Sequence, residues 1–255
     1  MKTRLSIFLT LSLCAALLFS CGDRTSEGAG DTSKGGATPT AALGVSEDMG
    51  KDYIDSFVFF GESTTYHLKS RGVLSGGKGT LQVLGNNSGT AILDHDTAST
   101  SVIYPETGEI MTFRKAIALK RPKYLFMSFG LNGAVYKLKR GEEYFKDCYR
   151  SLIDAVKDAS PDTKIILGSC YPVAENMDMS SYSLTLDQLN SAIETLNGWT
   201  AELCVEVGAR YLNVNEVLTD ERGRLRLEYQ VGDGHHLNTA AYVKILDYIR
   251  THGYR

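Results

Sequence analysis

The sequence predicts an α/β fold, a three-layer α/β/α sandwich with a central, mainly parallel five-stranded sheet. Two observations point to it. Short apolar runs rich in aromatic and β-branched residues alternate with longer segments in which apolar residues recur at helical spacing. The chain has 255 residues, 43% of them hydrophobic and 22% charged, which suits one globular domain with a full core. Strands and helices that alternate at these lengths form parallel βαβ units with right-handed crossovers.

Five apolar runs are the expected strands. The run at residues 56–60 is followed by Gly61, and the run at residues 124–129 is followed by Gly130. Their unbroken apolar character is typical of strands that are buried on both faces of a sheet. Because ligands of open parallel sheets bind beyond the carboxyl ends of the strands, functional residues are expected just after these runs. The five expected strands are residues 56–60, 81–84, 124–129, 164–169 and 210–214.

Three longer segments have the apolar periodicity of helices, at residues 142–159, 184–207 and 240–252. The first of them ends shortly before Pro161, which cannot continue a helix. Between residues 92 and 104 the alternation of strands and helices breaks. A small hairpin or an irregular insert is expected there.

Charge and cysteine content argue against several classes of function. The formal net charge is -3 and no basic stripe is present, so nucleic acid is not expected as a partner. Cys148, Cys170 and Cys204 lie in the globular part, and three cysteines cannot all pair within one chain. We expect them to be free and buried. No Cys-x-x-Cys motif or Cys/His cluster occurs, so no metal is expected.

The N-terminus has the pattern of an export signal. A basic start is followed by an apolar run at residues 5–19, which is shorter than the roughly 20 residues that cross a bilayer. The run closes in Leu-Phe-Ser-Cys, which resembles a bacterial lipobox whose cysteine, here Cys21, receives the lipid. The alternative is an ordinary signal peptide with an incidental cysteine.

The residues after Cys21 are rich in Gly, Ser, Thr and Ala and cannot bury enough apolar surface to fold. These patterns predict a lipoprotein signal peptide at residues 1–20, a flexible tether with lipidated Cys21 at residues 21–50, and a globular domain at residues 51–255. The domain would be anchored to a bacterial membrane, outside the cytoplasm.

A candidate nucleophile follows the first strand. In Gly61-Glu62-Ser63 the serine comes directly after the strand, where a helix is expected to begin. A serine at that position is exposed at the edge of the sheet, and the helix N-terminus offers free N–H groups to a developing oxyanion. The alternative is that Ser63 only caps the helix.

A candidate base precedes the last helix. A serine hydroxyl needs a base to become nucleophilic, and the base needs a partner that fixes its tautomer. Asp233 and His236 can meet on a tight turn that Gly234 permits. His235 is the competing histidine, and a histidine-rich surface loop is the alternative for the whole segment.

In this order, Gly-Glu-Ser, the Gly-x-Asn at residues 130–132 and the Asp-x-x-His before the final helix resemble the SGNH (GDSL-type) hydrolase family. The resemblance covers the chain from about residue 57 to the C-terminus. It implies a flavodoxin-like sheet in an SGNH hydrolase domain and ester hydrolysis through an acyl-serine, with no metal, nucleotide or other cofactor. The family pattern makes Ser63 the nucleophile and His236 the base, oriented by Asp233.

The same resemblance assigns the oxyanion hole. Its donors would be the Ser63 N–H, the Asn132 side-chain amide and the N–H of Gly89, which follows the expected strand at residues 81–84. If that strand is misplaced, a glycine further upstream takes the third position. The candidates are Gly72, Gly76 and Gly77.

Two residues depart from the family pattern. Glu62 replaces the usual aspartate before the serine and is one methylene longer. Gly133 replaces the aspartate that commonly follows the asparagine. Neither change removes a group that handles protons or charge, so the site is expected to be active.

The expected activity is that of an extracytoplasmic serine esterase acting on O-acyl, in particular O-acetyl, esters of carbohydrates or cell-envelope polymers. The alternatives are an O-acyltransferase, a lysophospholipase or lipid esterase with the same site, and an inactive glycan-binding lipoprotein. Aromatic residues in the expected active-site loops either stack on sugars or simply pack. The loop at residues 171–184, with Met177 and Met179, either lines an acyl site or is a mobile surface loop. The sequence leaves the oligomeric state open. The aromatic candidates are Tyr66, His67, Tyr136, Tyr171 and Tyr182.

Overall fold

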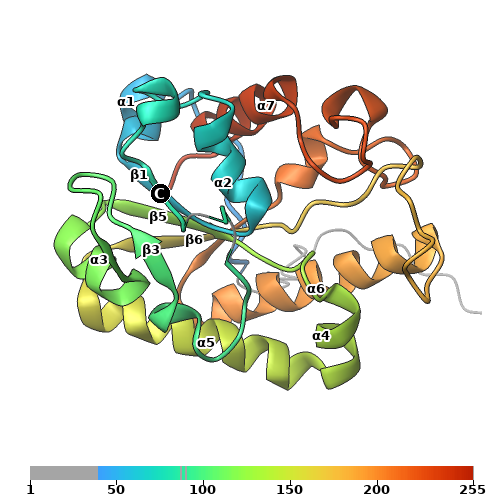
Figure 1. Cartoon of the computed structure of the whole chain (residues 1–255), viewed down its shortest axis with the longest axis horizontal. Helices are drawn as coiled ribbons and strands as arrows, with labels where there is room; N and C mark the ends of the chain where they lie inside the picture. The colour runs from blue at the N-terminus through green and yellow to red at the C-terminus, as the bar shows by residue number, and fades with distance from the viewer. Residues whose placement is uncertain (1–39, 87, 90, 255) are drawn as a thin grey trace, which may run out of the picture. The chain divides into compact units, whose positions relative to one another are not determined.

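The computed structural model describes residues 40–254 apart from residues 87 and 90. Five strands form one sheet in the order β2-β1-β5-β6-β7, and every neighbouring pair is parallel (Figure 1). All five expected strands are present, so the predicted fold class is confirmed. The strands are β1 (Phe57–Gly61), β2 (Val83–Leu84), β5 (Tyr124–Ser128), β6 (Lys164–Gly168) and β7 (Arg210–Leu212).

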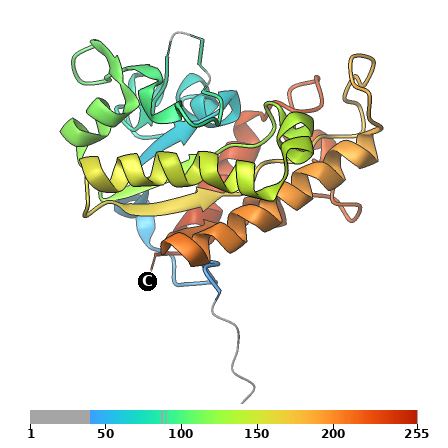
Figure 2. The same ribbon diagram turned by 90° about the horizontal axis from the view of Figure 1, so that it is seen from below.

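Helices cover both faces of the sheet. In Figure 1, α1, α2 and α7 lie above the sheet and α3, α4, α5 and α6 lie below it. Figure 2, seen from below, shows the long helices α5 and α6 crossing that lower face. The result is the three-layer arrangement that the sequence predicts. The helices are α1 (Gly50–Asp55), α2 (Ser63–Ser70), α3 (Phe113–Lys120), α4 (Ala134–Arg140), α5 (Glu142–Ala159), α6 (Leu186–Val207) and α7 (Thr239–Arg250).

The alternation of side chains along β1 divides the core into two parts. All five residues of β1 are buried. Phe57 and Phe59 point to the cluster that contains α7, whereas Val58 and Phe60 point to the cluster that contains α5. Phe60 stacks on Phe113 of α3, with ring centroids 3.9 Å apart. Strand β1 is therefore fixed from both faces, which holds the residues that follow it.

The long helices lie close to their predicted positions. Helix α5 spans the predicted residues, and α6 begins at Leu186, after a capping box in which Thr185 and Gln188 satisfy each other's backbone N–H groups. The break in alternation proves to be a hairpin. It lies slightly later than expected, with β3 (Ser101–Ile103) antiparallel to β4 (Ile110–Thr112).

The globular part begins earlier than predicted. The expected tether reached residue 50, but the backbone of Ala41 and Leu43 pairs with that of Tyr211 on β7, at 2.9 Å and 2.8 Å. Ala41 is also buried. Only the part of the tether before residue 40 remains a prediction. That part, the signal peptide at residues 1–20 and lipidation at Cys21 lie outside the described residues. Within the described residues, no helix is both long and apolar enough to cross a membrane.

Cys148, Cys170 and Cys204 are free and buried. Burial raises the pKa of the Cys204 thiol to about 12 and also raises the pKa values of the other two thiols. All three therefore remain protonated near neutral pH and pack as small apolar groups, as the sequence predicts.

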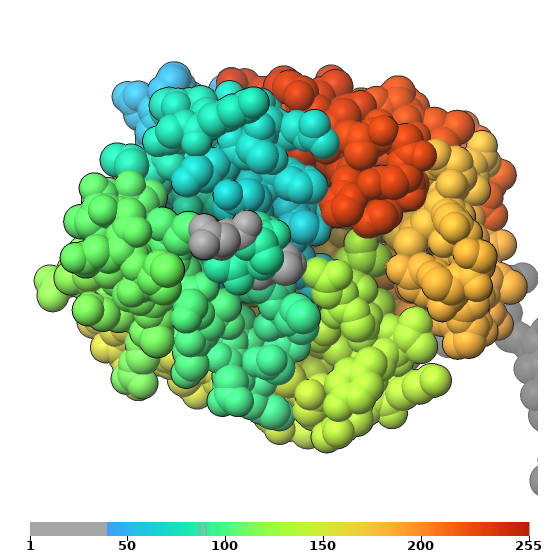
Figure 3. Space-filling model, in the orientation of Figure 1, coloured from blue at the N-terminus to red at the C-terminus, as the bar shows by residue number. Residues whose placement is uncertain are grey.

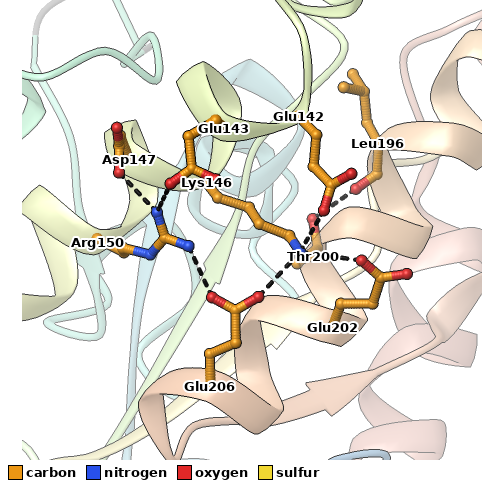
Figure 4. Close-up of polar contacts among 9 residues, drawn as sticks. All are labelled: Glu142, Glu143, Lys146, Asp147, Arg150, Leu196, Thr200, Glu202 and Glu206. Carbon is orange, nitrogen blue, oxygen red and sulfur yellow. Dashed lines mark hydrogen bonds and ion pairs between the residues drawn. The ribbon is translucent and has the colours of Figure 1, made fainter.

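A buried lysine joins α5 to α6 (Figure 4). The side chain of Lys146 is only 6% exposed, and its ammonium forms ion pairs with Glu142, Glu202 and Glu206 at 2.6 to 2.9 Å. Burial by itself lowers the pKa of Lys146. The three carboxylates outweigh this effect and raise the pKa well above its usual range. Arg150 also binds Glu206, at 2.7 Å, so the two helices share one network of charges.

We expect Lys146→Met to lower the free energy of unfolding by about 1–3 kcal/mol, because removing a buried cation leaves its carboxylates unpaired. The lower end of the range reflects the exposure of those carboxylates.

The loss of stability should also depend on pH. Hydrogen bonds from Arg150 and Lys146 lower the pKa of Glu206, so the contribution of Glu206 to stability is present above its unfolded pKa and is lost as the pH falls through its folded pKa. Calorimetry at pH 7 and at about pH 3 should therefore show a smaller difference in the free energy of unfolding between the wild type and Lys146→Met at the acidic pH. Lys115→Met, at an exposed lysine on α3, is the control. An equal loss of stability in both variants would exclude this role for the network.

Candidate active site

Ser63 lies where β1 passes directly into α2, and it is the first residue of that helix. The chain is tightly packed at Gly61, where an added Cβ would lie 2.4 Å from the carbonyl oxygen of Ser128. The neighbouring strand β5 therefore excludes a side chain at position 61. A first-turn N–H has no acceptor within its own helix. Ser63 can thus present both its hydroxyl and its N–H at the carboxyl end of the sheet.

The structure brings Ser63 together with His236 and Asp233. The Oγ of Ser63 is 3.3 Å from Nε2 of His236, and Nδ1 of His236 is 2.7 Å from Oδ2 of Asp233. Because the carboxylate accepts the Nδ1–H, Nε2 is left free to accept the serine proton. The longer of the two distances, between Ser63 Oγ and His236 Nε2, is usual for a nucleophile and its base when no substrate is bound. The three groups can therefore move a proton from Ser63 to His236.

Asp233 is fixed by backbone hydrogen bonds as well as by the imidazole. Its Oδ1 accepts from the N–H of His236 at 2.9 Å and from the N–H of His235 at 3.1 Å. Partial burial by itself raises the pKa of Asp233. The hydrogen bonds from His236 and His235 outweigh this effect and hold the pKa well below its usual range. Asp233 is therefore ionised throughout the neutral pH range.

The turn that carries Asp233 and His236 packs on the loop after β6. Gly234 has a φ of +82°, and an added Cβ would lie 2.5 Å from the Cα of Met177. Its carbonyl also accepts from the N–H of Ala174 at 2.7 Å. The loop at residues 171–184 therefore packs against the catalytic turn and supports it, a role that the sequence did not predict.

Two further histidines flank His236. His235 contacts the Asp233 backbone carbonyl through Nδ1 at 3.2 Å, and it is His236 that reaches Ser63. His67, one turn after Ser63, has its ring centroid 5.0 Å from that of His236. Burial, followed by the neighbouring His236, lowers the pKa of His67. The donor atoms of Asp233, His235 and His236 lie within 4.8 Å of one another, close enough to hold a metal ion, but hydrogen bonds already join these residues.

Asn132 lines the same cavity as Ser63, and it follows β5, as the sequence predicts. Its backbone N–H donates to both carboxylate oxygens of Glu62, at 3.2 Å and 3.1 Å. The N–H of Gly130 donates to the same carboxylate at 3.0 Å. Glu62 is buried, and it joins the junction of β1 and α2 to the loop after β5.

Gly89 does not fit its predicted role. Its N–H donates to the carbonyl of Asn86 at 3.0 Å, so it is used inside its own loop. Gly89 instead makes room for Tyr66, because an added Cβ would lie 2.7 Å from that ring. The upstream glycines were alternatives only for a misplaced strand, and β2 lies where it was predicted. The Ser63 N–H and the Asn132 side chain remain the candidate donors.

Two cavities meet at Asn132. One, of about 720 Å³, contains Ser63 and is lined by Asp94 and Lys137. The other, of about 470 Å³, lies on the side of His235 and Met177. Figure 3 shows the surface hollowed where the blue-green segment after β1 approaches the lime segment of α4. A substrate bound across Ser63 would thus have room on either side of the scissile bond.

The aromatic candidates divide between these cavities and the core. Tyr136, on α4, is 54% exposed and lines both cavities, and Tyr182 lines the second. Tyr171 is buried in the core instead. Tyr144 and Lys137 line the first cavity but were missed from the sequence. Both lie on helices whose apolar spacing gives no sign that a polar residue faces an active site.

We expect Asn132→Ala to lower kcat about 10²- to 10³-fold with a small change in KM, because an oxyanion donor acts mainly in the transition state. Steady-state kinetics on p-nitrophenyl acetate would measure the change. Asn213→Ala, on the chain after β7, serves as the control. Unaltered kcat in Asn132→Ala would remove this residue from the oxyanion hole.

Comparison with known proteins gives a family and a fold. Residues 21–244 match the GDSL-like lipase/acylhydrolase family. No curated protein matches the chain. A solved structure from Streptococcus pneumonia is similar at 21% identity and a TM-score of 0.50, covering 76% of this chain and 81% of that one.

Two other solved structures are similar to the chain. A DUF4886 family protein from Bacteroides uniformis ATCC 8492 is 13% identical, with a TM-score of 0.50 and 78% of this chain and 83% of that chain covered. The periplasmic domain of a lipopolysaccharide acetyltransferase from Salmonella ser. Paratyphi A is 16% identical, with a TM-score of 0.47 and coverage of 76% and 82%. At these identities the likeness concerns the fold alone.

Proposed function

Because the chain belongs to the GDSL-like lipase/acylhydrolase family, we propose that it is a serine esterase that hydrolyses O-acyl esters through an acyl-enzyme on Ser63. The observation that carries the proposal is the continuous hydrogen-bonded series from Ser63 through His236 to Asp233. A capping serine alone would need neither the base nor its ionised partner.

In the proposed mechanism, Nε2 of His236 takes the hydroxyl proton as Ser63 Oγ attacks the ester carbonyl. The Ser63 N–H and the Asn132 amide stabilise the oxyanion. His236 then gives its proton to the leaving alkoxide, and the alcohol departs. Water, deprotonated by the same histidine, attacks the acyl-serine. The bond to Oγ of Ser63 breaks, His236 returns the proton to Oγ, and the acid departs. Asp233 stays ionised throughout and stabilises the imidazolium.

We propose carbohydrate esters, in particular O-acetyl esters, as the substrate class. The cavity beside Ser63 combines polar side chains such as Asp94 with the rings of Tyr136 and Tyr144, and its apolar part is a short one made by Ile92 and Leu93. Such groups suit the hydroxyls and apolar faces of a sugar, whereas a long acyl chain needs a continuous apolar lining.

We further propose that the enzyme works outside the cytoplasm, held to a bacterial membrane by a lipid on Cys21. The support is the N-terminal sequence alone: a basic start, a short apolar run and a cysteine at its end. Acetylated glycans or envelope polymers would be within reach of an enzyme anchored there. Mass spectrometry of Cys21 in the membrane fraction tests this location, and an unlipidated, fully released chain would exclude it.

A series of p-nitrophenyl esters from acetate to palmitate, together with acetylated xylan, tests the activity and its substrate class on the full chain. We expect turnover of acetate, a steep fall with chain length and release of acetate from the polysaccharide. A preference for long chains would instead indicate a lipid esterase. Absence of turnover on every ester, with the chain folded, would exclude the proposed hydrolase.

A further inference from the structure

We propose that Lys137 is a positioning residue of this active site, which together with Glu62 holds the peptide groups of Asn132 so that its side-chain amide faces the oxyanion. The inference rests on the proposed function, because it takes Asn132 as an oxyanion donor. Lys137 itself would not contact the reacting atoms.

Asn132 is held on both sides by buried charged groups. Glu62 accepts its N–H through both carboxylate oxygens, and the Nζ of Lys137 donates to its carbonyl. Glu62 and Lys137 are each only 3% exposed. The peptide group before Asn132 is held through its N–H and the peptide group after it through its carbonyl. The backbone of Asn132 therefore has little freedom to rotate, which fixes the start of its side chain.

The two charges depend on one another. Burial raises the pKa of Glu62 and lowers that of Lys137, while the charge of each counters the shift of the other. Two isolated charges at this depth would be strongly unfavourable, so their joint presence around one residue calls for an explanation. The support of Asn132 provides this explanation, because the backbone of Asn132 forms hydrogen bonds with both Glu62 and Lys137.

Both departures from the family pattern fit this arrangement. Glu62, longer than aspartate by one methylene, reaches the N–H groups of Gly130 and Asn132. Gly133 has a φ of +76°, and an added Cβ would lie 3.3 Å from the Nζ of Lys137. A side chain at position 133 would therefore press on the ammonium of Lys137, whereas glycine leaves room for this ammonium.

The test is a double-mutant cycle of Lys137→Met and Asn132→Ala in the full chain, with kcat and KM on p-nitrophenyl acetate. We expect Lys137→Met alone to lower kcat about tenfold to a hundredfold, because a misplacement of about 1 Å can cost a hundredfold. KM should change less than about twofold, as for a group that acts in the transition state. In the Asn132→Ala background the same substitution should have almost no further effect. Equal losses in both backgrounds would overturn the proposal, because Lys137 would then act independently of Asn132.

Lys146→Met is the matched control, since it removes a second buried lysine that lies in another network. It should lower the melting temperature without changing kcat. If Lys137→Met does not fold, the charge-balanced variant Glu62→Gln/Lys137→Met replaces it, because no unpaired buried charge remains. Full kcat in that folded double variant would also overturn the proposal.

Hydrogen exchange separates this inference from the proposed function. Amide exchange in residues 130–136 should quicken in Lys137→Met and stay unchanged in Lys146→Met, whether or not the wild-type chain hydrolyses esters. Unchanged exchange in Lys137→Met excludes the positioning role. Absent ester turnover in the wild-type chain excludes the proposed function instead.

Discussion

Replacing Ser63 by alanine is expected to lower kcat about 10⁴- to 10⁶-fold, the range seen when a triad nucleophile is removed. Without Oγ, no acyl-enzyme can form, while the cavity, the Ser63 N–H position and the Asn132 amide remain. KM should therefore change little, and the residual rate should no longer need His236. The measurement is steady-state hydrolysis of p-nitrophenyl acetate, together with labelling by a fluorophosphonate probe.

Ser70→Ala, at the exposed far end of the same helix, is the control. It should retain both turnover and labelling. Ser63→Ala should unfold at the wild-type temperature, because a hydroxyl bound only at 3.3 Å contributes little to stability. Wild-type turnover in Ser63→Ala would show that another group performs the reaction.

Asp233→Asn is expected to lower kcat about 10³- to 10⁴-fold, because an amide in place of the carboxylate favours the wrong tautomer of the base. In the native site Oδ2 accepts from Nδ1 of His236 at 2.7 Å. An asparagine NH₂ at that position turns the proton onto Nε2, so the imidazole can no longer accept from Ser63. Kinetics between pH 6 and 9 would show the loss at every pH.

Asp162→Asn, at an exposed turn before β6, is the control for the loss of one surface charge. Asp233 also accepts the N–H groups of His235 and His236, so unfolding must be monitored as well. If Asp233→Asn stays folded and keeps more than about a tenth of kcat, the carboxylate does not orient the base in the way that this type of triad requires.

The sheet could be predicted because its strands are buried on both faces and therefore read as unbroken apolar runs, of which residues 57–60 are the clearest. The long helices α5 and α6 carry enough turns to show their periodicity. Helices α1, α3 and α4 have only six to eight residues, and no pattern identified them. Whether short helices of this kind form depends mainly on the surfaces onto which they pack.

The site was predictable where chemistry limits the choice of residue. Ser63, Asp233 and His236 are types that few other roles require together, and the structure places them in contact. Gly89 was not predictable, because a glycine that offers its N–H and one that makes room for Tyr66 look the same in sequence. Lys137 was hidden for the opposite reason, since a lysine on a helix is normally exposed.

The pairing of residues 41–43 with β7 bears on how the protein can be shortened. Strand β7 ends the sheet, and this segment occupies its outer hydrogen-bonding groups at Tyr211. A form beginning at residue 51, the domain boundary that the sequence predicts, would expose this edge to a strand from another copy. Such a form should associate and precipitate, and light scattering would detect this. One beginning at residue 40 should stay monodisperse under the same conditions.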